Sequence, residues 1–216
     1  MSIIILEEYV ETGNFQDLDM LLSKQPELLG EITSHDVSPL LLACYYRKNQ
    51  IVDIILKYLK NISVHEVCAL GYLEQLELMV DQKPNIVNEI STNGFSPLGI
   101  AAHFGNESVV RLLLRHHADP NIASQNGYHV FPIHAALSAN DTAITKLLIE
   151  AGAEVNVIQH GSITPLHLAA QHGNIDIIII LLEHGVDISV RSDQGLTAAD
   201  IAFDKGFKEI GEILSL

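Results

Sequence analysis

The stretch TPLHLAAQHGN, residues 164–174, decides the fold of this 216-residue chain. Thr164 belongs to the residue types that cap helices, and Pro165 follows at the first helical position, where its missing N–H costs nothing. His167 stands at the third helical position and can reach back to the cap, as a glutamate does in a capping box. Gly173 marks the turn that ends the helix. The stretch predicts a short capped helix. Its histidines either form part of a catalytic or metal site or have a purely structural role.

The same pattern recurs along the chain, which predicts a repeat protein. Counterparts of the stretch are SPLLLACYYRKN (38–49), SPLGIAAHFGN (96–106), FPIHAALSAN (131–140) and TAADIAFDKG (197–206). His134, His167 and Asp200 occupy the fourth place in three successive blocks and are 33 residues apart. Two less regular blocks fit the same frame: LEEYVETGNFQDLDMLL (6–22) with Glu7 in the fourth place, and SVHEVCALGYLEQLELMV (63–80) with His65 there.

Each block is followed by a second segment with helical apolar spacing, such as Ile175, Ile178 and Leu182. An extended link with a turn at its tip comes next, and the Asn-Gly pairs at 93–94 and 126–127 suit the positive φ angles of such a turn. We expect seven units in a single domain, residues 1–216, with the first and last units acting as caps. The expected bounds of the units are 2–33, 34–60, 61–90, 91–123, 124–157, 158–190 and 191–216.

The sequence resembles the ankyrin-repeat family over essentially its whole length. The Thr-Pro-Leu-His motif at 164–167, Gly185 and the Ala-x-Val-Asn motif at 153–156 carry this resemblance. It implies an all-α solenoid of stacked antiparallel helix pairs, joined by loops of the β-hairpin type.

The histidines of the pattern do not indicate catalysis. Leu41, Gly99 and Asp200 occupy the place of His167 in other units, and a place that accepts leucine, glycine and aspartate is not a shared catalytic centre. In ankyrin repeats this histidine is structural. The sequence has no glycine-rich phosphate loop and no zincin helix. We therefore expect no catalytic site, no metal and no cofactor, and the chain is predicted not to be an enzyme.

Two departures from the regular repeat predict local differences. After the second unit the expected hairpin is missing, and Ser63-x-x-Glu66 provides a capping box instead, so we expect a seam with altered twist there. Between Gly127 and Pro132 there are two residues more than usual, which predicts a longer, protruding tip.

Composition limits the expected partners and location. The chain carries 27 acids against 12 Lys and Arg, a formal net charge of −15, so nucleic acid is not an expected partner. Its hydrophobic fraction of 48% excludes a disordered chain. The N-terminus lacks the basic start of a signal peptide, and the longest apolar run, 177–182, is too short to span a bilayer. Cys44 and Cys68, without a CxxC pair, predict a cytoplasmic location. The stacking that the family resemblance implies would place them too far apart for a disulfide, so we expect packing roles.

The family resemblance implies that the tips and the exposed ends of the first helices form a concave surface that binds another protein or peptide. We expect a monomer that uses this surface and does not bind membranes. Aromatic and imidazole side chains are dense there, which is typical of interface hot spots. The predicted partner-binding residues are Tyr45, Tyr46, Phe95, His103, Phe104, Tyr128, His129, His160, Ile163, Gln171 and His172.

Two alternatives stay open. Phe104 and one of the tyrosines can instead pack into the core between repeats. The array can also be a structural or self-associating piece without a specific ligand in its groove, and the sequence leaves the identity of any partner open.

Overall fold

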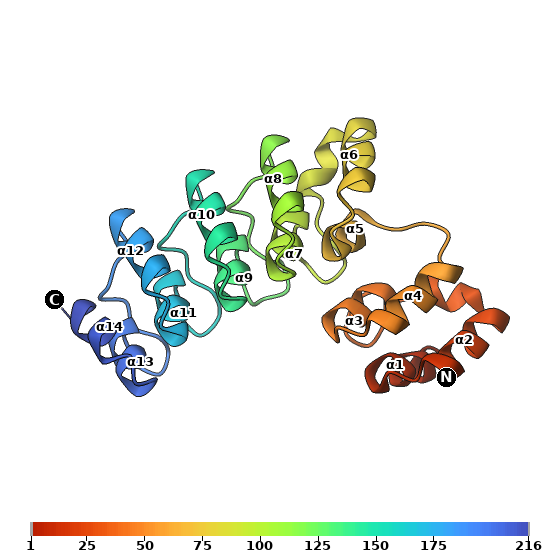
Figure 1. Ribbon diagram of the computed structural model, residues 1–216, viewed down its shortest axis with the longest axis horizontal. Helices are drawn as coiled ribbons and strands as arrows, with labels where there is room; N and C mark the ends of the chain where they lie inside the picture. The colour runs from red at the N-terminus through yellow and green to blue at the C-terminus, as the bar shows by residue number, and fades with distance from the viewer. Residues whose placement is uncertain (1, 216) are drawn as a thin grey trace.

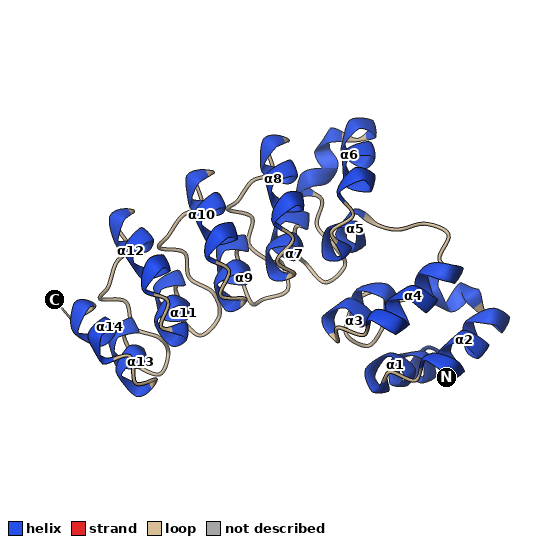
Figure 2. Cartoon of the chain, viewed as in Figure 1, coloured by secondary structure: helices blue, strands red, loops and turns tan. Residues whose placement is uncertain are grey.

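The structure is a computed structural model that describes residues 2–215. Within that range the chain forms fourteen α-helices and two short 3-10 helices, with no β-strand, which confirms the all-α prediction. The helices follow one another in pairs along a row, as Figure 1 and Figure 2 show. The helices are α1 (Ser2–Thr12), α2 (Phe15–Lys24), η1 (Pro26–Gly30), α3 (Pro39–Tyr45), α4 (Asn49–Tyr58), α5 (Val64–Leu70), α6 (Leu73–Gln82), η2 (Pro84–Asn88), α7 (Pro97–His103), α8 (Glu107–Arg115), α9 (Pro132–Ser138), α10 (Thr142–Glu150), α11 (Pro165–His172), α12 (Ile175–Glu183), α13 (Ala198–Asp204) and α14 (Lys208–Ile213).

The pairs pack against one another in two layers. The first helix of each pair packs beside the first helix of the next, from α1 to α13, and most of the second helices do the same in the other layer (Figure 1). The buried apolar side chains form one continuous core that extends from Leu6 to Leu214. Because a single pair leaves its apolar face open, each pair depends on its neighbours for burial.

The Thr-Pro signature starts its helix as predicted. The Thr164 hydroxyl accepts a hydrogen bond from the His167 backbone N–H (3.4 Å), and the His167 Nδ1 accepts one from the Thr164 N–H (3.2 Å). Pro165 is the first helical residue. The Nε2 atom of His167 lies 3.1 Å from the carbonyl oxygen of Leu196, in the tip that precedes α13. This histidine therefore closes a helix cap and links two repeats.

The loops that precede the first helices, called tips here, are closed by the same kind of backbone hydrogen bond. In the tip before α7 the Ser91 N–H donates to the Phe95 carbonyl, four residues later (2.9 Å). In the tip before α9 the Ser124 N–H donates to the Val130 carbonyl (2.9 Å), six residues later, so this tip is longer by two residues, as predicted. Neighbouring tips are also joined to each other, for example by a hydrogen bond from the N–H of Gln125 to a carbonyl of the preceding tip (2.8 Å).

Two glycines at equivalent tips allow the close approach of neighbouring tips to be tested. Gly94 and Gly127 have φ angles of +85° and +84°, where alanine is strained. A Cβ atom on Gly94 would lie 2.9 Å from the backbone N of Asn126, whereas one on Gly127 would meet nothing within 4 Å. We therefore expect Gly94→Ala to lower the free energy of unfolding by about 1–2 kcal/mol more than Gly127→Ala. Urea unfolding measures both variants, and equal losses would show that the tips are not tightly packed.

The second and third pairs are joined without a tip, as predicted. α4 ends at Tyr58 and α5 begins at Val64, with an extended link between them (Figure 1). The Ser63 hydroxyl and N–H donate to the Glu66 carboxylate (2.8 and 2.7 Å), so the predicted capping box is present. Ser38, which caps α3, donates to the same carboxylate. The buried Glu66 therefore connects the two pairs where the hairpin is missing, and the altered twist stays a prediction.

The register of α5 differs from the sequence expectation. α5 has seven residues between its cap, Ser63, and the left-handed residue that ends it, whereas α11 has eight. Consequently Glu66, and not His65, takes the capping place that His167 has in α11. The His65 Nε2 atom lies 2.8 Å from the Glu89 carbonyl oxygen, so His65 still links its repeat to the next.

Candidate functional site

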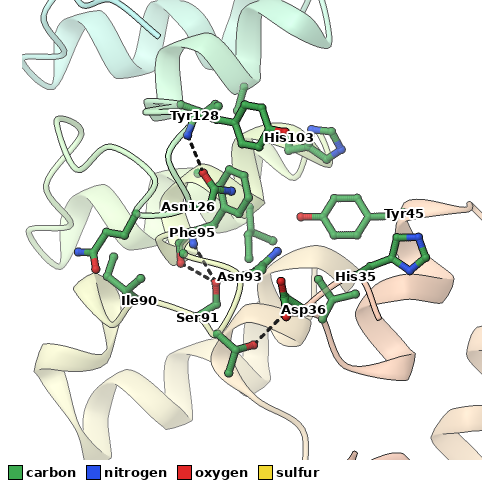
Figure 3. A pocket seen from close by; sticks show the side chains of 18 of the residues that line it. His35, Asp36, Tyr45, Ile90, Ser91, Asn93, Phe95, His103, Asn126 and Tyr128 are labelled. Atoms are coloured by element: carbon green, nitrogen blue, oxygen red, sulfur yellow. Dashed lines mark hydrogen bonds between the residues drawn. The ribbon is translucent and has the colours of Figure 1, made fainter. Parts of the chain in front are cut away.

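A groove with a volume of about 920 Å³ lies beside the seam, on the side of the molecule that carries the tips (Figure 3). Four tips and the ends of three first helices border it, the fourth tip through Gln159 alone. This volume is within the usual range of ligand-binding pockets. Its walls include the tip residues His35, Asp36, Asn93, Phe95, Asn126 and Tyr128 and the helix residues Tyr45, Tyr46, His103 and Ser138.

The groove exists because the third pair contributes neither a tip nor a large side chain. Counted back from the turn that ends each helix, Ala69 of α5 stands where α3 carries Tyr45. Tyr45 therefore reaches across α5 to His103 and Phe104 at the end of α7, with ring centroids 5.4 and 5.1 Å apart. Such aromatic pairs are favourable beyond the area that they bury. The pairs on either side of the third one thus form a joint aromatic wall.

The tips on the two sides of the third pair are also in direct contact. The Thr92 hydroxyl donates to the Asp36 carbonyl oxygen (3.1 Å). Asp36 has a φ angle of +58°, in the left-handed region that glycine takes in the next tip, and aspartate tolerates this conformation better than most residues. The tip at 33–37 therefore makes its turn without a glycine.

Two asparagines present amide groups to the groove. The Asn93 side-chain oxygen accepts a hydrogen bond from the Ser91 hydroxyl (2.6 Å), and the Asn126 oxygen accepts one from the Ser124 hydroxyl (2.8 Å). Figure 3 shows Asn93 and the Tyr45 hydroxyl pointing toward each other across the groove. Amide groups held in this way can donate to the backbone carbonyls of a bound peptide.

The groove is nearly uncharged although the chain is acidic. Among the described residues that line it, Asp36 is the only carboxylate, and no Lys or Arg is present. Burial lowers the pKa of His103, and the nearby Arg47 lowers it further, so this imidazole is neutral at pH 7. Burial also raises the pKa of Tyr45, an effect that Asn93 partly offsets. The groove is therefore suited to aromatic contact and neutral hydrogen bonding.

The cysteines and the potential metal ligands show no arrangement for chemistry within residues 2–215. No group of three or more His, Cys, Asp or Glu side chains there is placed to hold a metal ion. Cys44 and Cys68 are free and buried, and burial raises the pKa of Cys44 to about 12 and that of Cys68 as well. Both side chains therefore remain thiols, the less reactive form. Over the same range, no helix is long and apolar enough to cross a membrane.

The structure brings five of the predicted partner-binding residues together in the groove. They are Tyr45, Tyr46, Phe95, His103 and Tyr128. Tyr46 and Tyr128 are 41% and 59% exposed, so a partner can reach both. Tyr45 is half-buried and packs against the core, as the packing alternative describes for one tyrosine.

The other six predicted residues lie outside the groove. Phe104 is half-buried against the core and lines a neighbouring cleft, which also fits the packing alternative. His160 stacks edge-on against Tyr128, with ring centroids 5.6 Å apart, and extends the surface along the long tip. The remaining four, which do not line the groove, are His129, Ile163, Gln171 and His172.

Sequence reasoning missed His35, Asp36 and Asn126 as groove residues. A signal for the first two was present, because the tip at 33–37 precedes a Ser-Pro pair just as the tip at 91–95 does. Asp36 concealed it, since aspartate replaces the glycine that marks the other tips. Asn126 belongs to a recognised Asn-Gly turn, but its place in the groove depends on how the long tip folds.

Comparisons with known proteins agree with the repeat fold. The family model for ankyrin repeats (3 copies) matches residues 64–159 and 133–215, more than half of the chain. Ankyrin repeat and SAM domain-containing protein 6 of Mus musculus is 24% identical over 147 residues, 68% of this chain and 14% of that protein. The nuclear factor NF-kappa-B p105 subunit of Gallus gallus is 29% identical over 172 residues, 73% of this chain and 17% of that protein. The DNA-binding protein RFXANK of Homo sapiens is 39% identical over 67 residues, 31% of this chain and 26% of that protein.

This chain spans less than a third of the length of each of these relatives. What it shares with them is the repeat region, and ankyrin repeats generally mediate protein–protein interaction. The capped helix pairs, their stacking in two layers and the family match lead to one conclusion: the chain belongs to the ankyrin-repeat family.

Proposed function

We propose that this chain binds an extended segment of a partner protein in the groove beside the seam. One observation carries the proposal: the missing tip of the third pair leaves a groove of about 920 Å³ that is walled by aromatic side chains and amide groups. The general role of ankyrin repeats in protein–protein interaction supports a protein ligand. The groove wall carries little charge, with Asp36 as the only carboxylate among its described residues, and this favours a segment that offers apolar side chains and free backbone groups.

Two tyrosines are the proposed anchors of the partner. Tyr46 extends from the end of α3 and Tyr128 from the long tip, and both line the groove with exposed rings. Tyrosine brings a large contact area at a low cost in side-chain entropy, which is why it is common in hot spots. Asn93 and Asn126 are proposed to pair with backbone groups of the segment, and the neutral His103 can donate or accept.

The proposal includes the setting in which the chain acts. Its buried, unpaired thiols suit a reducing compartment such as the cytoplasm. Its net charge of −15 opposes contact with nucleic acid or an anionic membrane surface. We propose a monomer that acts by binding alone, without a metal, a cofactor or catalysis.

Replacing both anchors tests the proposal. A partner is first isolated by pull-down, identified by mass spectrometry and purified, and its Kd is then measured by calorimetry. The double variant Tyr46→Ala/Tyr128→Ala is expected to bind at least about thirtyfold more weakly, because hot-spot residues contribute about 2 kcal/mol or more. Tyr72→Ala is the matched control, since Tyr72 is 40% exposed and lies outside the groove. Circular dichroism verifies that both variants remain folded.

An unchanged Kd in the folded double variant would place the partner elsewhere on the chain and reject the groove. The structural alternative makes a different prediction, a homo-oligomer of fixed size in light scattering across a concentration series. If the anchors are buried in that oligomer, the groove serves self-association instead of partner binding.

A further inference from the structure

The sequence holds two Asn-Gly pairs in neighbouring tips, and the structure gives them different surroundings. Asn93-Gly94 lies in the tip before α7, and Asn126-Gly127 lies in the longer tip before α9. Asparagine followed by glycine is prone to lose its side-chain ammonia, because glycine has no side chain to hinder attack by its own backbone nitrogen. We propose that Asn126 is a self-modification site, which converts to aspartate and isoaspartate in the folded protein, while Asn93 is protected.

The reaction needs only water and proceeds without oxidation or reduction. The backbone nitrogen of Gly127 loses its proton to water or hydroxide and attacks the Asn126 side-chain carbon Cγ. A new bond from this nitrogen to Cγ forms, the bond from Cγ to Nδ2 breaks, and ammonia leaves with a proton from the solvent. The resulting five-membered succinimide then takes up one water molecule. Opening at one carbonyl yields aspartate, and opening at the other yields isoaspartate.

The structure protects Asn93 because the attacking nitrogen beside it is already engaged. The Gly94 N–H donates a hydrogen bond to the Ser91 carbonyl oxygen (2.9 Å). Its tip is also packed against the next tip, since a Cβ atom on Gly94 would lie 2.9–3.0 Å from backbone atoms of Gln125 and Asn126. Attack on Asn93 therefore requires a hydrogen bond to break and two packed tips to separate.

At Asn126 the contact between the two tips does not reach the attacking residue, since it is made by backbone atoms of Gln125 and Asn126 and not by Gly127. Within the described part of the chain, the Gly127 N–H has no hydrogen-bond acceptor, and a Cβ atom on Gly127 would meet nothing within 4 Å. The Asn126 side chain is exposed. The backbone nitrogen of Gly127 can therefore lose a proton to solvent and approach the Asn126 side chain without breaking a hydrogen bond.

Two hydrogen bonds prepare the Asn126 carbonyl for attack. Its oxygen accepts from the Tyr128 backbone N–H (3.2 Å, drawn in Figure 3) and from the Ser124 hydroxyl (2.8 Å). Donors at this oxygen withdraw electron density from Cγ and stabilise the negative charge that develops as the nitrogen adds, in the manner of an oxyanion hole. Asn93 has the equivalent serine donor (2.6 Å), so the Tyr128 N–H is what distinguishes Asn126 on this count.

The modification would change the groove, and this consequence alone rests on the proposed function. Asn126 lines the groove beside Tyr128, where Asp36 is the only carboxylate among the described lining residues. Conversion adds a second negative charge there, and isoaspartate also lengthens the backbone of the tip by one methylene group. A partner segment with a Lys or Arg side chain would gain from the added charge, whereas an acidic segment would be repelled.

The test compares the two asparagines in one sample of the full chain. Folded protein is incubated at mildly alkaline pH, and the gain of one mass unit and the isoaspartate content at each site are followed by peptide mapping. We expect Asn126 to react about tenfold faster than Asn93, the factor that corresponds to freeing one hydrogen-bonded N–H. In denaturant, where both tips are unfolded, the two rates are expected to converge. Asn126→Gln is expected to remove the fast phase and leave the slow one.

Equal rates in the folded protein, or an Asn126 that reacts only in denaturant, would overturn the proposal. The measurement requires no partner. A groove that fails to bind a protein therefore leaves the deamidation result intact, and a deamidation failure leaves the binding experiment unaffected.

Discussion

Leu166→Ala is expected to lower the free energy of unfolding by about 2–5 kcal/mol, because it leaves a cavity in the shared core. Leu166 is only 1% exposed and lies in the first turn of α11. α11 packs against α9 on one side and α13 on the other, so the loss should spread to both neighbours. Urea unfolding measures the loss in free energy. Hydrogen exchange of the amides in α9 and α13 shows whether it spreads.

Leu78→Ala is the matched control for this substitution. Leu78 lies on α6 and is 62% exposed, so the same truncation there should cost less than about 0.5 kcal/mol. Equal losses for the two variants would contradict a core that is shared between stacked repeats. If hydrogen exchange quickened in α11 alone, the repeats would be independent of one another.

Acidification from pH 6.5 to pH 4 is expected to destabilise the protein by about 3 kcal/mol through His134 alone. His134 is fully buried, and burial lowers its pKa from the ordinary 6.5 to about 4, an effect that the nearby Ile163 and Val157 carbonyls offset only in part. Within residues 2–215, its Nε2 atom has no hydrogen-bond partner. As the pH falls below 6.5, His134 binds a proton in the unfolded chain but stays neutral in the folded chain. The free energy of unfolding therefore decreases until the pH falls below the pKa of His134 in the folded state. Urea unfolding at a series of pH values measures this loss.

His134→Asn isolates this contribution from the other titrating groups. The asparagine oxygen can replace Nδ1 as the acceptor for the Phe131 N–H (3.3 Å) but does not titrate. The variant should therefore lose less stability between pH 6.5 and pH 4 than the parent does. His129→Asn, at an exposed position with a φ angle of +51° that asparagine tolerates, is the matched control for the exchange of histidine for asparagine. Identical pH profiles for His134→Asn and the parent would show that His134 is not protected from protonation.

The caps and turns of the fold could be predicted from the sequence because each one depends on residues a few positions apart. Thr164 and Pro165 start α11, and Ser63 with Glu66 starts α5, through hydrogen bonds within a single helical turn. The longer tip followed from counting two additional residues before Pro132. The register of α5 was predicted less well, because the stretch between its cap and the left-handed residue that ends it is one residue shorter than in its counterparts, and the shift appears only when both ends are placed.

The groove could be predicted only in part. Tyr45 and Tyr46 are adjacent in the sequence and were predicted for the same surface, yet one is half-buried and the other is 41% exposed. Their difference depends on α7, whose His103 and Phe104 rings cover the first tyrosine. No local pattern around Tyr45 contains this information.

The sequence by itself determined that this protein is a row of capped helix pairs of the ankyrin type with one hairpin missing. Capping, positive φ angles and apolar spacing are properties of short segments, so a single sequence displays them directly. Only the tertiary structure decided that the missing hairpin becomes a groove and that two like Asn-Gly turns differ in exposure. Both outcomes depend on which groups of different repeats come into contact when the pairs stack. Such contacts depend on distances in space, which the order of residues does not reveal.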